Sequence, residues 1–144
     1  MTPGDSQKSN VLLENLAFLI GTWDLQLAFP SDPSTPVQAE ATIDWLESGG
    51  FAVYRLGDSR WIIGPDETTG EYSVLYHDGR GVSRVYQMSL DEKSWKMWRY
   101  SPGFSQRFHG RFNDDQSVIK ALWEKSSDGD IWEHDFDLKY SRKT

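Results

Sequence analysis

From Trp23 onward, stretches in which apolar side chains recur at every second position follow one another, and this alternation most constrains the fold. In two of these stretches, the apolar face also contains polar side chains. One face would carry Val82, Arg84, Tyr86, Met88 and Leu90, and another would carry Trp132, His134, Phe136, Leu138 and Tyr140. Successive side chains of a β-strand point to opposite faces, so we expect each set to face a common interior.

About nine or ten such stretches follow one another, separated by short segments rich in glycine, proline, aspartate and asparagine. Consecutive hairpins without a long crossover favour an all-β, antiparallel up-and-down barrel over a sandwich. A short helix is expected before them, capped by Asn10 and ended by Gly21. Residues 1–9 are polar and are expected to form a disordered tail, which leaves a single domain over residues 10–144.

Charge and composition exclude several classes of function. Lys and Arg number 15 against 22 acidic residues, and the net charge of −7 opposes binding to nucleic acid or to an anionic membrane. The chain has no cysteine, so disulfides, zinc–thiolate sites and iron–sulfur clusters are excluded. No signal peptide or membrane-spanning apolar segment is visible, so we expect a cytoplasmic protein. The sequence leaves the oligomeric state open, a homodimer included.

The segment Gly21-Thr22-Trp23, between the short helix and the strands, resembles the opening of the calycin-type barrels: lipocalins, fatty-acid-binding proteins and nitrobindin. Residues 76–86 and 103–108 are similar to stretches of small bacterial lipocalin-like barrels of unassigned function. The resemblance implies a calycin-type barrel with a small-molecule site inside. It also implies that Arg142, near the chain end, packs across Trp23. The chain lacks the glycines that follow this tryptophan in nitrobindin.

Arg84 and Tyr86 are the first candidates for a ligand site, because they lie one strand step apart on an apolar face. A guanidinium binds a carboxylate through two parallel hydrogen bonds, and the phenol adds one donor. The pair is similar in chemistry, though not in position, to the Arg-x-Tyr pair with which fatty-acid-binding proteins hold a carboxylate. The alternative is an internal ion pair between Arg84 and Asp78 or Glu47.

Further residues are expected around this pair, so the predicted ligand is small, partly apolar and anionic. Polar side chains that would orient it are Tyr76, Gln106, Arg55 and His134, and apolar walls would come from Met88, Trp98, Phe108 and Phe136. For each polar residue, hydrogen bonding across strands without any ligand is the alternative.

His134 supports two other hypotheses. An inward imidazole would be able to ligate haem iron, as nitrobindin does with a histidine late in its chain. In a barrel enzyme, an isomerase or cyclase, His134 or Asp78 would carry a proton. The histidines show no spacing typical of other metal sites. Whether the chain catalyses a reaction is left open, as is an interaction domain with a packed interior.

Overall fold

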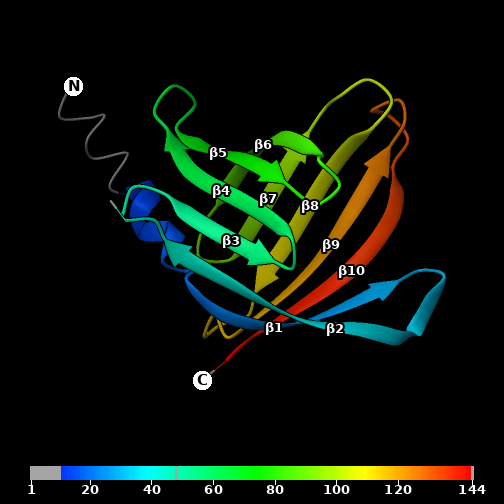
Figure 1. The fold of residues 1–144 in the computed structure, drawn as a ribbon, viewed down its shortest axis with the longest axis horizontal. Coiled ribbons are helices and arrows are strands. Elements are labelled where there is room, and N and C mark those ends of the chain that lie inside the picture. Colours follow the sequence, from blue (N-terminus) through cyan, green and yellow to red (C-terminus); the bar gives the residue numbers. More distant parts are fainter. Residues whose placement is uncertain (1–10, 48, 144) are drawn as a thin grey trace.

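The structure, a computed structural model, describes residues 11–47 and 49–143. They form a closed, ten-stranded antiparallel barrel preceded by a helix over residues 11–16 (Figure 1), which confirms the predicted fold class. The strands are β1 (Gly21–Phe29), β2 (Asp32–Trp45), β3 (Ala52–Leu56), β4 (Ser59–Asp66), β5 (Glu71–His77), β6 (Ser83–Leu90), β7 (Ser94–Arg99), β8 (Ser105–Phe112), β9 (Val118–Ser126) and β10 (Glu133–Arg142). Each pairs with the next, and β10 pairs with β1. The predicted tail and Asn10 lie outside the described residues.

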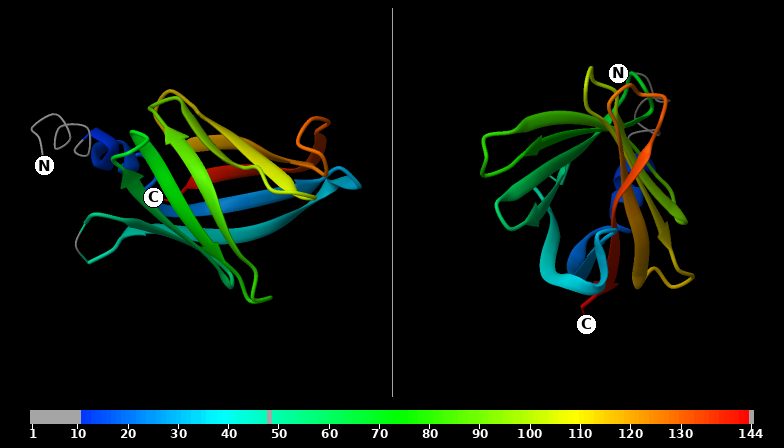
Figure 2. Two further views of the ribbon diagram at one scale, coloured as in Figure 1. Left: turned by 90° about the horizontal axis from the view of Figure 1, so that it is seen from above. Right: turned by 90° about the vertical axis from the view of Figure 1, so that its right-hand side faces the viewer.

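The helix lies at one end of the barrel (Figures 1 and 2). Buried apolar side chains fill that end. Leu16 and Leu19 are fully buried beside Trp23, and Trp95 and Met88 are buried to the same extent. Burial of each such side chain contributes roughly 1.5–3 kcal/mol to folding. The barrel is therefore packed at the helix end, and space for a ligand has to be sought at the other.

Arg142 links the last strand to the segment that joins the helix to β1. Its guanidinium carbon lies 4.1 Å from the ring centroid of Trp23, which confirms the expected contact. Its Nη1 donates to the carbonyl of Ile20 at 2.6 Å, and Nη2 donates to that of Phe18 at 2.8 Å. Gly21 makes room for this approach, because a Cβ atom there would lie 2.7 Å from Nη1.

Gly21→Ala is expected to lower the free energy of unfolding by about 2–4 kcal/mol. The φ angle of +144° disfavours a side chain, and the methyl group would displace Arg142. Gly103→Ala is the matched control, because Gly103 has a φ of +84° but open space where the Cβ would be. Urea denaturation of both variants measures the difference. Equal losses would contradict the close approach of Arg142.

A β-bulge in β10 reverses the expected alternation over part of that strand. The register against β9 shifts between His134 and Phe136, so Asp135 is an extra residue that has no register partner on β9. Phe136 keeps the predicted inward orientation, whereas side chains before the bulge point to the face opposite to the predicted one. The prediction that His134 and Trp132 face the interior is therefore wrong: His134 is exposed, and Trp132 packs outside against Arg107, 4.1 Å away.

Arg55 and Trp98 were also predicted on the wrong face. Tyr54 pairs with the buried Ile43 and faces inward, so Arg55 points outward, where its Nη1 lies 3.5 Å from Asp44. In β7 the buried residues are Trp95 and Met97, which leaves Trp98 on the outer face. Both strands carry apolar residues on both faces, so their sequences do not indicate which face is buried.

Candidate ligand cavity

The barrel interior contains a cavity of about 360 Å³. Its lining includes Ser59, the first residue of β4 after the turn from β3, and Phe104, in the loop between β7 and β8. It therefore opens at the end opposite the helix, which faces the viewer in the right-hand part of Figure 2. Aliphatic walls come from Leu27, Leu56, Met97 and Leu138. A volume of this size is at the lower end of the range for small-molecule pockets, so the interior is not simply packed.

The structure brings five of the ten predicted site residues together around this cavity: Arg84, Tyr86, Tyr76, Gln106 and Phe136. Met88 and Phe108 face inward as expected but are buried in the core and do not line the cavity. Arg55, Trp98 and His134 lie on the outer surface. That the five lining residues bind a ligand remains a prediction.

Arg84 is a half-buried cation at the cavity without an ionic partner. Its guanidinium carbon lies 5.2 Å from the ring centroid of Phe104 and 5.9 Å from that of Tyr76. Among the described residues no carboxylate lies within 4 Å of it, and the two proposed partners are engaged elsewhere or exposed. Asp78 pairs with Arg80 at 2.6 Å, and Glu47 is exposed. Arg84 also lies near the Tyr86 hydroxyl, and its other donors are available to a ligand.

Asp78 has a structural role at the turn between β5 and β6. It accepts hydrogen bonds from the Arg80 side chain and from the Tyr76 hydroxyl, the latter at 2.7 Å. These bonds hold the pKa of Asp78 well below its usual range. A carboxylate that stays ionised is a poor proton carrier. Its bond to Tyr76 instead fixes the orientation of that ring in the cavity wall.

Asp78 is expected to make the stability of the barrel sensitive to acid. Because its pKa is lowered on folding, its contribution is present above about pH 4, the pKa of an unfolded aspartate, and is lost as the pH falls below it. Wild-type protein should lose stability on acidification more steeply than Asp78→Asn. Urea denaturation at neutral pH and in the acid range measures both slopes, and parallel profiles would contradict this role.

The other polar groups of the cavity mainly offer donors. The Tyr86 hydroxyl donates to Gln106 Oε1 at 2.7 Å, and the Gln106 amide nitrogen donates to no acceptor within residues 11–47 and 49–143. The hydroxyls of Tyr54 and Tyr140 are 2.7 Å apart and share one hydrogen bond, so one proton remains. Burial raises the pKa of both phenols and keeps them protonated. The buried Nε1 of Trp61 has no hydrogen-bond partner in the part of the chain that the structure describes. Such a lining favours a ligand rich in acceptors.

Twelve of the seventeen residues that line the cavity were not among the predicted site residues, and four of them show why. Tyr140 lay on the face predicted to be inward, so the alternation was sufficient to find it. Tyr54 and Trp61 lie on adjacent strands, with ring centroids 4.4 Å apart, and a misplaced β3 face concealed that pair. Asp135 reaches the lining only because of the bulge, and Lys125 Nζ lies 3.7 Å from its carboxylate. No local pattern predicted that placement.

The residues present do not fit a haem held by histidine inside the barrel. The chain has three histidines, and none of them lines the cavity. His134, the predicted haem ligand, is exposed, and its Nε2 lies 2.9 Å from Asp137. The same position removes it as a proton carrier for a reaction in the cavity. Over residues 11–47 and 49–143, no three His, Asp or Glu side chains are grouped so that they would hold a metal ion.

No protein-family model matches the sequence, and a search of curated proteins finds no match. The likeness to calycin-type barrels therefore depends on the closed ten-stranded barrel and on the contact between Trp23 and Arg142. In the part of the chain that the structure describes, no helix is long and apolar enough to span a membrane.

Proposed function

We propose that this barrel binds a small, partly apolar anion, such as a medium-chain carboxylate, in its internal cavity. The observation that carries the proposal is Arg84, a half-buried guanidinium that lines the cavity and has no carboxylate within 4 Å among the described residues. Removing a charge from water is costly unless a partner compensates. A ligand carboxylate would supply two acceptors in the geometry that a guanidinium binds best.

The rest of the lining supports both parts of such a ligand. Leu27, Met97 and Leu138 offer apolar surface to a short hydrocarbon chain. The hydroxyl of Tyr54 or Tyr140 would bind a further acceptor, if the ligand has one deeper in the cavity. The net charge of −7 does not oppose this binding, because a cation in direct contact outweighs distant charges that solvent screens.

A comparison of octanoate with octanol tests the proposal by isothermal titration calorimetry. The two probes share a hydrocarbon chain of the same length and differ in the charged head. Octanoate is expected to bind about ten-fold more tightly or better, because a charge-assisted hydrogen bond contributes about 1.5–3 kcal/mol. Equal affinities, or no binding of octanoate at all, would contradict the proposal.

A further inference from the structure

At the cavity end of the barrel, β6 and β7 are no longer paired with each other, and this gap in the wall is called the seam. The β6–β7 ladder ends at the pair Gln87–Trp98, although β6 begins at Ser83. On its other edge, β6 remains paired with β5 as far as Ser83 and His77. β7 likewise remains paired with β8 up to Arg99. The two strands therefore separate from each other while each is still held by its outer neighbour.

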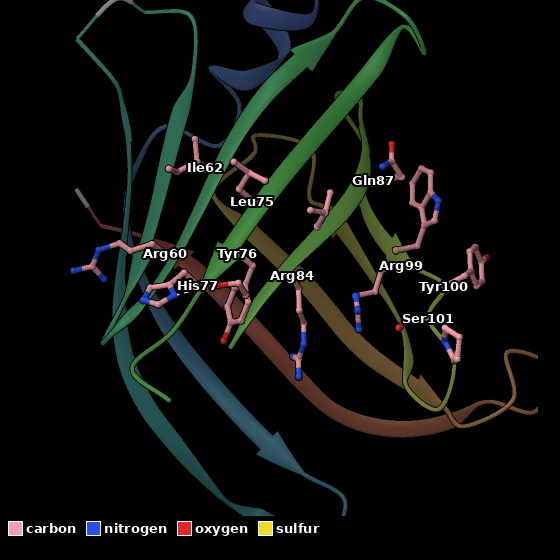
Figure 3. A pocket seen from close by; sticks show the side chains of 14 residues that line it. Arg60, Ile62, Leu75, Tyr76, His77, Arg84, Gln87, Arg99, Tyr100 and Ser101 are labelled. Atoms are coloured by element: carbon pink, nitrogen blue, oxygen red, sulfur yellow. Dashed lines mark hydrogen bonds between the residues drawn. The ribbon is translucent and has the colours of Figure 1, made fainter. Parts of the chain in front are cut away.

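A groove of about 810 Å³ lies on the outer face over this seam (Figure 3). Val85 and Leu75, register partners on β6 and β5, contribute apolar surface and are 53% and 56% exposed. Trp98 and the exposed Tyr100 border the groove on the β7 side. Exposed apolar side chains gathered in one hollow are typical of a binding surface.

The groove adjoins the internal cavity, because Arg84 and Tyr76 line both. Arg84 comes from β6 and Arg99 from β7, so the two guanidinium groups belong to opposite sides of the seam (Figure 3). Arg60 also lines the groove, and no Asp or Glu among the described residues does so. In a chain of net charge −7, a hollow with three arginines and no acid favours an anionic group.

We infer that the groove is a second subsite, which binds the bulky anionic head of an amphiphile whose apolar chain occupies the cavity. This inference rests on the proposed function and specifies its ligand class. The head lies beside Arg84 at the seam and carries more than one negative charge. The guanidinium groups of Arg84, on β6, and Arg99, on β7, bind these charges. A flat ring in the head packs against Trp98 or Tyr100. A phosphorylated nucleotide joined to an acyl chain has these features.

Octanoyl-coenzyme A and octanoate are the probes that separate the two subsites. Wild-type protein is expected to bind the thioester about ten-fold more tightly than octanoate, because the groove adds contacts to the head. Arg99→Met should remove most of that advantage and leave octanoate affinity unchanged. Arg111→Met, an exposed arginine of β8 that lines neither hollow, is the matched control and should change neither value.

The outcomes distinguish failure of this inference from failure of the proposed function. If octanoate does not bind, the proposed function is wrong and the groove subsite falls with it. If octanoate binds through Arg84 but the thioester binds no better, only the groove subsite is wrong. An equal effect of Arg99→Met and Arg111→Met on the thioester would also overturn it, since the effect would then reflect overall charge.

A covalent block of the groove provides an independent measurement. The chain has no cysteine, so Val85→Cys introduces a single thiol that a pyrene maleimide labels. The label on Val85→Cys should abolish the advantage of the thioester and spare octanoate binding. Val37→Cys is the matched control, because Val37 is 52% exposed, lies on β2 and does not line the groove. Undiminished thioester binding by labelled Val85→Cys would overturn the inference.

Discussion

Arg84→Met is expected to weaken octanoate binding by about 10- to 100-fold and to leave octanol binding unchanged. Methionine preserves most of the apolar length of arginine, so the cavity wall remains, but all the guanidinium donors are lost. No protein carboxylate is released by the change, because Asp78 is held by Arg80. Isothermal titration calorimetry with both probes measures the effect.

Arg55→Met is the matched control for this experiment. It removes the same charge from the outer face of β3, where Arg55 lies 3.5 Å from Asp44 and does not line the cavity. A long-range effect of net charge would appear in both variants, whereas a direct contact appears only in Arg84→Met. Equal losses of octanoate affinity would contradict the anchoring role of Arg84, as would an equal loss for octanol.

Arg142→Met is expected to lower the free energy of unfolding by about 2–4 kcal/mol. The substitution leaves the carbonyls of Ile20 and Phe18 without their donors, and each unpaired group costs about 1–3 kcal/mol where water does not replace the bond. The cation–π contact with Trp23, which contributes about 0.5–2 kcal/mol, is lost as well. Urea denaturation measures the change.

Arg111→Met is the comparison for stability, because Arg111 is exposed and the change should cost less than about 0.5 kcal/mol. The cavity lies at the opposite end of the barrel from Arg142, so folded Arg142→Met should keep wild-type affinity for octanoate. A stability loss no greater than that of Arg111→Met would show that the contact with Trp23 does not hold the barrel end.

The alternation of side chains predicted the antiparallel strands, and consecutive hairpins without a long crossover favoured a barrel over a sandwich with the same alternation. It also placed Arg84, Tyr86 and Gln106 correctly, since the outer faces of their strands are mostly polar, with Val85 as the apolar exception. The alternation predicts whether a side chain points into or out of the barrel, but not how far along the barrel axis it lies. Met88 and Phe108 thus face inward, as predicted, yet lie in the packed core and not at the cavity.

The errors have physical causes that no single strand reveals. The bulge at Asp135 depends on how β10 pairs with β9, and it turned His134 outward. Arg55 was misplaced because both faces of β3 are apolar. The seam beside Arg84 depends on where the pairing of β6 with β7 ends, which is a property of two strands together. The groove was therefore not predictable from local patterns.

A crystal structure of the protein with octanoate bound tests the central claim most directly. We expect the hydrocarbon chain inside the barrel beside Met97 and Leu138, and both carboxylate oxygens at about 2.7–2.9 Å from the guanidinium nitrogens of Arg84. A carboxylate bound elsewhere, or an Arg84 guanidinium paired with a protein carboxylate above an interior filled by side chains, would contradict the account.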